Sequence, residues 1–478
     1  MRRISGAPFA LLLFTTAAAA IPASAQLRAI SPGERAQGQQ AHPQLLQKFG
    51  GAYGGPQAAY VAQVGKRIAV QSGLSNSERD FTVTLLNSPV NNAFAVPGGY
   101  VYVTRQLLAL MNDEAELAAV LGHEVGHVAA RHGSSRSRTS TVGSVLAGVL
   151  GAVTGSSQIG QIAGQAAQLY TLRFSRQQEL QSDDLGVRYL STAGYDPLAM
   201  STVLASLANQ NALDQRAGGE AGSAPEWAST HPDPASRVNR AGQRAQQTAR
   251  PGGQRNRDAF LAAIDGMVYG DDPRQGAIEG RTFRHPDLRI AFSAPPGFAL
   301  TNSPEAVSIT GRSGQGQLST AAFRGDLDDY VRRVFVGLGG AAPADAAIRR
   351  TTVNGLNAAF ATVRATTGRQ SVDASVFAYV TAPDTAYHFV LVTPAGQGIG
   401  SFAPLVESFR RLSNQDAAQI RARVVDVVTV RSGDSPERLA QGMAFDDLKL
   451  ERFLVLNGLR PGATLRPGEK VKLITWSR

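Results

Sequence analysis

Three of the seven histidines in this chain lie close together in the stretch VLGHEVGHVAARHG, residues 120–133. Within it, His123 and His127 are four positions apart, and Glu124 directly follows the first of them. On an α-helix, residues four apart lie on one face, so both imidazoles can reach the same ion. Glu124 is turned by roughly 100° on that helix, so its carboxylate can reach a water on the ion. The H-E-x-x-H spacing therefore predicts a metal site with a general base beside it.

A catalytic zinc site needs a third protein ligand and keeps one position open. The downstream segment SRQQELQSDDLG, residues 175–186, offers Glu179, with Asp183 one helical turn later. In this arrangement Glu179 binds the metal, and Asp183 orients a ligating imidazole from behind. Spacing alone favours Glu179 only slightly over an ordinary solvated carboxylate.

Four other histidines lack metal-ligand spacing. His132 is five residues beyond His127, about 140° around a continuing helix, so we expect it to be structural, together with Arg131. Residues outside any such pattern are expected to be ordinary core or surface histidines: His42, His285 and His388.

The elements that must position these side chains have clear sequence signals. A helix is expected from about 113 to 132, with acidic residues in its first turn and Gly133 at its end, and another from about 175 to 193. Residues 80–88 alternate like a strand, and 93–110 indicate strand, Pro-Gly-Gly turn, strand and helix. The Gln- and Gly-rich residues 26–55 are expected to form a loose arm.

Four blocks of sequence together strongly resemble the gluzincin family of HtpX, BepA and the CAAX prenyl proteases, over about residues 40–245. The blocks are NNAFAVPGGYVYVTRQLL, AELAAVLGHEVGHVAARHG, FSRQQELQSDDLGVRYLSTAGYDP and WASTHPDPASRV. The resemblance implies one zinc ion bound by His123, His127 and Glu179, with Glu124 as general base and Asp183 behind a ligand. It also implies a mainly helical, zincin-type domain. The family usually has alanine at Ser182.

The resemblance extends to residues that would contact substrate. His231 and Arg237 match family positions over the zinc, where they would hydrogen-bond the oxyanion; alternatively His231 fills the open metal position and keeps the enzyme latent. The run 95–104 resembles the family's edge strand, which holds an extended substrate by strand addition. Its candidate contact residues are Ala95, Gly98, Gly99 and Tyr100.

The N-terminus predicts export. Two arginines precede an apolar run and the small-residue sequence Ala23-Ser24-Ala25, which together indicate a cleaved signal peptide over residues 1–25. The chain has no cysteine, so it lacks disulfides and the lipid-attachment residue of a lipoprotein. We expect a periplasmic protein. The net charge of +10 is spread along the chain without a nucleic-acid-binding motif, so no nucleic-acid partner is expected.

Composition divides this α+β multidomain chain further. The peptidase domain is expected over 26–250, a linker over 251–279, an α/β domain over 280–413 with a faint PsbP-like pattern, and a linker over 414–423. Within the first of these, the small-residue stretch 141–170 predicts either a packed helical hairpin or a flap with peripheral membrane contact.

Residues 424–478 resemble a LysM domain, with strand, helix, helix and strand in a βααβ order. LysM domains bind N-acetylglucosamine-containing glycans, so the resemblance implies peptidoglycan as a partner. The sequence departs from the usual motif at Ser435 and Pro436, which leaves glycan binding and a purely structural role equally open.

Together these features predict a zinc-dependent endopeptidase that acts on unfolded or misassembled envelope proteins, the substrate class being an analogy with the family. The alternative is a periplasmic chaperone or peptidoglycan-bound adaptor with latent or little proteolysis. Intact His123, Glu124, His127 and Glu179 favour the enzyme, because an adaptor has little need of Glu124.

Overall fold

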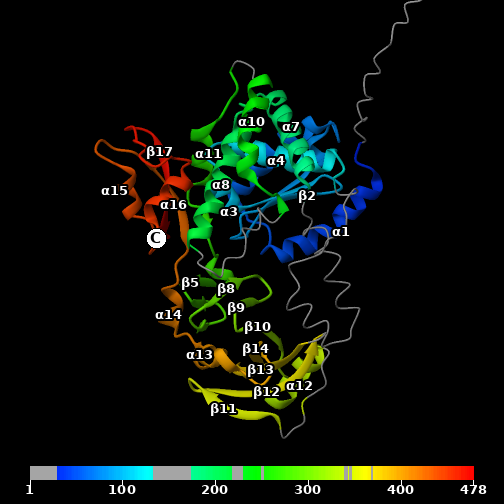
Figure 1. Cartoon of the computed structure of the whole chain (residues 1–478), viewed down its shortest axis with the longest axis vertical. Coiled ribbons are helices and arrows are strands. Elements are labelled where there is room, and N and C mark those ends of the chain that lie inside the picture. The colour runs from blue at the N-terminus through cyan, green and yellow to red at the C-terminus, as the bar shows by residue number, and fades with distance from the viewer. Residues whose placement is uncertain are drawn as a thin grey trace, which may run out of the picture.

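The computed structural model describes residues 29–132, 174–217, 230–248, 252–338, 343, 347–367 and 370–478 (Figure 1). The expected signal peptide and the expected hairpin or flap at 141–170 lie outside these residues. Among the described helices, none combines the length and apolar character needed to cross a bilayer. The chain has the helices, sheets and several packed units of the expected α+β multidomain fold.

A small three-stranded sheet lies beside the metal-site helices. Its order is β1-β3-β2, with β1 (Thr82–Leu86) parallel to β3 (Tyr100–Thr104) and β2 (Ala93–Val96) antiparallel to it. Ala95 therefore lies on an edge strand. Tyr100 lies on the central strand β3, which is paired on both sides. The expectation that Tyr100 belongs to an edge strand open to substrate is therefore wrong.

The turn between β2 and β3 requires glycine. Gly98 and Gly99 have φ values of +95° and +87°, in the left-handed region that favours glycine. A Cβ on Gly98 would lie 2.5 Å from the backbone oxygen of Glu34, so the turn packs directly against the helix that contains Glu34.

That helix, α1 (Pro32–Lys48), corrects the expectation of a loose arm. Ser31 and Glu34 form a capping box at its start, and Leu45 is buried with Tyr102 of β3 in one apolar cluster. The apolar residues of α1 form only a weak stripe, so the sequence pattern gives little indication of a helix. Most of the stability of this helix comes from packing against the sheet.

Among its described residues, the peptidase region also contains five longer helices: α2 (Gly55–Ala69), α4 (Glu114–Ala129), α7 (Arg176–Thr192), α8 (Ala199–Ala217) and α10 (Pro234–Thr248). A sixth, α3 (Arg105–Leu110), is short. Helix α4 is almost entirely buried at the centre (Figure 1). It approaches α7 closely because Gly186 has no side chain: a Cβ there would lie 3.3 Å from the backbone nitrogen of His123. This close approach places the carboxylates of α7 against the histidines of α4.

Residues 277–411 form an antiparallel domain at the lower end of Figure 1. Its seven-stranded sheet has the order β11-β12-β13-β14-β10-β9-β8, and a four-stranded sheet has the order β15-β7-β6-β5. Helix α12 (Leu327–Gly337) covers one face of the larger sheet, and α13 (Ala403–Ser408) packs with the smaller sheet on the other. The strands are β5 (Ala277–Glu279), β6 (Thr282–His285), β7 (Ile290–Ser293), β8 (Phe298–Asn302), β9 (Val307–Gly311), β10 (Gly314–Ala322), β11 (Arg349–Val353), β12 (Leu356–Thr367), β13 (Gln370–Ala382), β14 (Thr385–Pro394) and β15 (Arg410–Arg411).

The two expected linkers contain regular structure. Residues 251–279 include α11 (Arg257–Ile264) and β4 (Val268–Tyr269) in addition to β5, and residues 414–423 include α14 (Asn414–Ala418). The C-terminal module then follows the expected order: β16 (Arg423–Thr429), α15 (Pro436–Gln441), α16 (Lys449–Leu456) and β17 (Lys470–Trp476). Its identity as a LysM domain stays a prediction. Strand β4 joins its sheet in the order β17-β16-β4.

The C-terminal module shares one hydrophobic core with the peptidase region. Phe453 and Ile474 belong to the same buried cluster as Leu117 and Leu121 of α4. In Figure 1 the module lies beside α8 and α11. Lys472 of β17 is fully buried there and donates a hydrogen bond from Nζ to the carbonyl oxygen of Ala109 at 2.8 Å. The module is thus packed into the body of the peptidase rather than tethered to it.

Candidate metal centre

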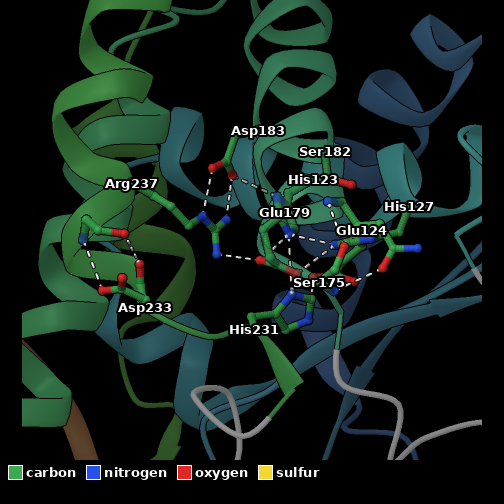
Figure 2. A network of polar contacts seen from close by, with 12 residues as sticks. His123, Glu124, His127, Ser175, Glu179, Ser182, Asp183, His231, Asp233 and Arg237 are labelled. Atoms are coloured by element: carbon green, nitrogen blue, oxygen red, sulfur yellow. Dashed lines mark hydrogen bonds and ion pairs between the residues drawn. The ribbon is translucent and has the colours of Figure 1, made fainter. Parts of the chain in front are cut away.

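Helices α4 and α7 bring the three predicted ligands together (Figure 2). The Nε2 atoms of His123 and His127 are 2.9 Å apart. Glu179 lies between them, with one carboxylate oxygen 3.4 Å from His127 Nε2 and the other 3.6 Å from His123 Nε2. All three side chains are buried. Residues separated by more than fifty positions therefore converge on one point.

His231 joins this cluster from the segment before α10. Its Nδ1 lies 3.0 Å from Glu179 Oε1 and 3.4 Å from His123 Nε2. The four potential ligand atoms of His123, His127, Glu179 and His231 all lie within 4.8 Å of one another. His231 thus lies where it could complete a four-ligand set, which is one of the two alternatives that the resemblance left open.

The donor set fits zinc. Three imidazole nitrogens and one carboxylate oxygen are typical ligands of a four-coordinate zinc ion. Two ring nitrogens that face each other at 2.9 Å can share at most one proton, whereas a bound cation would accept the lone pairs of both. Several lone pairs thus point to one place in a buried site. A hydrogen-bond network alone explains this arrangement poorly, whereas a bound cation explains it directly.

Protonation also favours the ligand forms. Burial lowers the pKa of His127 well below its ordinary value, so the ring is neutral near pH 7. Burial by itself raises the pKa of Glu179, but electrostatic interaction with His231 and hydrogen bonds with His127 and His231 outweigh it. The net pKa of Glu179 lies well below its ordinary value. Neutral imidazole and ionised carboxylate are the forms that bind metal.

Glu124 lies beside the four ligand atoms rather than among them. It is buried on α4, and its Oε1 is 3.5 Å from Nε2 of His231. Glu124 is not one of the four potential metal ligands, and its action as a general base stays a prediction.

A buried ion-pair network supports the cluster from behind (Figure 2). Asp183 Oδ1 lies 2.9 Å from Nδ1 of His123. Arg237 of α10 donates from Nε to Asp183 at 2.7 Å, donates from Nη2 to the same carboxylate, and donates from Nη1 to Glu179. Burial raises the pKa of Asp183, but the charge of Arg237 outweighs it and holds the pKa below its ordinary value. Three nitrogens of Arg237 are thus engaged by these two carboxylates.

Two further residues contact His127 directly and a third reaches it through one of them, and none was expected at the site from the sequence. Phe174 stacks on the imidazole with ring centroids 3.6 Å apart. Nδ1 of His132 lies 2.9 Å from Nδ1 of His127, and Gln181 contacts His132 in turn. The expected helix to residue 132 is wrong: α4 ends at Ala129, and the left-handed backbone of Arg131, with φ of +55°, turns His132 back toward His127.

The other histidines lie elsewhere. Nδ1 of His42 is 2.8 Å from the hydroxyl of Tyr102, and Nδ1 of His388 is 2.8 Å from the hydroxyl of Tyr330 in the antiparallel domain. His285 lies on β6.

Comparison with known proteins gives a consistent picture. "Mitochondrial metalloendopeptidase OMA1" of Schizosaccharomyces pombe is 31% identical over 212 residues, which cover 43% of this chain and 59% of that protein. "Beta-barrel assembly-enhancing protease" of Escherichia coli K12 is 31% identical over 214 residues, covering 42% of each chain. "Metalloprotease LoiP" of Escherichia coli K12 is 33% identical over 120 residues, covering 24% of this chain and 47% of that protein.

The chain thus spans about half the length of the curated relatives it matches. The sequence profile described as "Peptidase family M48" matches residues 56–245, which contain every residue of the cluster described above. Residues 56–245 therefore carry a peptidase domain of the M48 type.

Proposed function

We propose that this chain is a zinc-dependent endopeptidase that hydrolyses peptide bonds in unfolded or misassembled proteins of the cell envelope. The observation that carries the proposal is the buried convergence of His123, His127 and Glu179, with the carboxylate of Glu124 beside them. The M48 match and relatives named as metalloendopeptidases support the reaction class.

Each residue has a role that follows from its position. His123, His127 and Glu179 hold one zinc ion per chain. A zinc ion held there would supply Lewis-acid chemistry for peptide hydrolysis. Glu124 accepts a proton from the attacking water and returns it to the leaving amine. Asp183 keeps the ring of His123 oriented, and Arg237 holds Asp183 and Glu179 in place.

Two roles are proposed for His231. In the arrangement described here it completes a four-ligand set, which supports a latent form in which no position is left for water. In an open form, with His231 away from the cluster, we propose that His231, with Arg237 as a second candidate, stabilises negative charge on the substrate carbonyl. A latent site would also be compatible with the alternative function, a chaperone or adaptor with little proteolysis.

The substrate class is supported by the sheet and by one relative. The outer side of β2, which includes Ala95, is a sheet edge on which an extended peptide could add as a strand, so recognition would depend on an unfolded backbone. The name "Beta-barrel assembly-enhancing protease" of a 31% identical relative supports envelope proteins as substrates. The proposal includes a periplasmic location after cleavage of residues 1–25, and peptidoglycan contact through residues 424–478.

Casein digestion by the purified mature protein tests the activity. The wild-type chain, Glu124→Gln and a chelator-treated sample are compared, with His231→Ala included because latency would mask cleavage. We expect chelator-sensitive cleavage that Glu124→Gln abolishes. If metal-loaded wild type and His231→Ala are both inactive, the chain is an adaptor rather than a peptidase.

A further inference from the structure

The imidazole of His127 has a second partner on the side away from the metal cluster. Its Nδ1 lies 2.9 Å from Nδ1 of His132, and Nε2 of His132 lies 3.0 Å from Oε1 of Gln181. The hydroxyl of Ser182 is 3.4 Å from the same Nδ1 of His132. His132 is buried, with 4% of its surface exposed, so these contacts replace water at its ring.

The contacts admit one consistent set of protons once Nε2 of His127 binds a metal. The proton of His127 is then on Nδ1, which makes this atom a donor. His132 must accept at its own Nδ1 and therefore carries its proton on Nε2. Gln181 accepts that proton through Oε1, the atom that the structure places there. Each group thereby fixes the tautomer of the next.

The backbone holds His132 in this position. Its N–H donates to the carbonyl oxygen of His127 at 3.0 Å, and the left-handed Arg131 makes the turn that permits it. Arg131 is in turn paired with Glu34 of α1. The turn after α4 is therefore anchored from α1, while the side chain of His132 is anchored from α7.

The two histidine ligands are supported in parallel ways from one helix. His123 receives Asp183 of α7 directly at its Nδ1. His127 receives Gln181 of α7 through His132. Outer hydrogen bonds of this kind fix the ring orientation of a ligand and raise its basicity, and their loss typically weakens metal binding about 10- to 100-fold.

We propose that His132 and Gln181 form a positioning relay for His127, which holds this ligand in the tautomer and orientation that present Nε2 to the zinc ion. The inference rests on the proposed zinc site. It assigns to His132 a role in metal affinity rather than in the fold alone.

The zinc dissociation constant of the full mature chain, measured by competition with a chelating indicator, tests the relay. We expect His132→Phe, which keeps an aromatic ring but offers no acceptor, to weaken zinc binding about 10- to 100-fold. His132→Asn places an amide oxygen near the former Nδ1 and should recover most of the affinity. Wild-type affinity in His132→Phe, or equal losses in both variants, would overturn the proposal.

Gln181 provides a test that does not disturb the core, because its side chain is exposed on α7. Gln181→Ala should weaken zinc binding, whereas Gln181→Glu should strengthen it, since a carboxylate is the better acceptor. Gln177→Ala, at another exposed position of the same helix, is the matched control and should leave affinity unchanged. If Gln181→Ala behaves like this control, the relay is refuted even where His132→Phe does not fold.

Two additional measurements separate the relay from the zinc site itself. Thermal unfolding of the zinc-free proteins establishes which variants are folded. Glu179→Ala removes a proposed ligand and should abolish tight binding. If Glu179→Ala binds zinc as the wild type does, the proposed site is wrong; if only the His132 and Gln181 variants are unaffected, the site stands and the relay fails.

Discussion

Asp183 Oδ1 lies 2.9 Å from Nδ1 of His123, and Arg237 donates hydrogen bonds to the same carboxylate from two nitrogens. The metal-site helix α4 is therefore linked through α7 to α10 by buried charged groups. Arg237 also donates to Glu179, and all three side chains are buried. One guanidinium therefore balances the negative charge of two carboxylates that are shielded from water.

Arg237→Met should consequently destabilise the zinc-free protein strongly. Removing one partner of a buried ion pair leaves uncompensated charge and costs about 3–5 kcal/mol in free energy of unfolding. Urea unfolding with and without zinc measures the change. The control is Arg240→Met on the same helix, whose half-exposed pair with Asp184 should contribute less than about 1 kcal/mol. Equal losses in the two variants would contradict a special role for Arg237.

Glu124→Gln should separate binding of metal from turnover. The amide cannot accept the proton of the attacking water, so we expect casein cleavage to fall by about 10²- to 10⁴-fold. Because Glu124 lies outside the four-ligand set, zinc content should stay at one ion per chain. Cleavage assays and metal analysis on the same preparation check both halves. Retained cleavage would exclude Glu124 as the base.

His231→Ala distinguishes the two proposed roles of that residue. If His231 fills the fourth position of the cluster, its removal opens that position and should raise casein cleavage. If it mainly stabilises the oxyanion, cleavage should fall instead, by about 10²- to 10³-fold for a lost donor. The arrangement described here, with Nδ1 of His231 3.0 Å from Glu179, favours the rise.

The stability of the whole chain should rise between pH 7 and pH 10 because of Lys472. Burial lowers the pKa of Lys472 to about 7, although the charge of Glu116 opposes this shift. In the unfolded chain the pKa is near its ordinary value of 10.5, so between these limits the unfolded state binds more protons. Raising the pH then favours the folded state by at most about 1.4 kcal/mol per pH unit for this group.

Urea unfolding at several pH values, compared between wild type and Lys472→Met, measures this contribution. The difference in free energy of unfolding between the two proteins should increase from pH 7 to pH 9. Lys470→Met on the same strand is the control, since Lys470 is partly exposed and should keep the wild-type pH dependence. A difference that does not vary with pH would refute the role of Lys472.

The metal site was more predictable than its surroundings. H-E-x-x-H spacing places two ligands on one helix face regardless of the rest of the fold, because that relation is local. Glu179 and His231 needed the family resemblance, since nothing in their own neighbourhood specifies a distant partner. His132 was misplaced because the helix was extended past Ala129, and a left-handed arginine at position 131 has no sequence signal.

Tertiary packing explains the other differences. Helix α1 looked like a loose arm because its residues are mostly polar, and only its contact with Tyr102 and the sheet reveals a structured element. Lys472 and Lys470 lie two positions apart on β17, and their sequence context does not distinguish the buried lysine from the partly exposed one. Burial of Lys472 depends on the peptidase core, where the carbonyl oxygen of Ala109 accepts its hydrogen bond from more than three hundred residues earlier in the chain.

The shared core of α4 and β17 has a consequence for biosynthesis. Phe453 and Ile474 belong to the same buried cluster as Leu117 and Leu121 of the proposed zinc-binding helix, so this cluster is incomplete without the C-terminal module. A nascent or truncated peptidase region should therefore remain incompletely folded. Assembly of the proposed metal site would then depend on the C-terminal module being folded against the peptidase region.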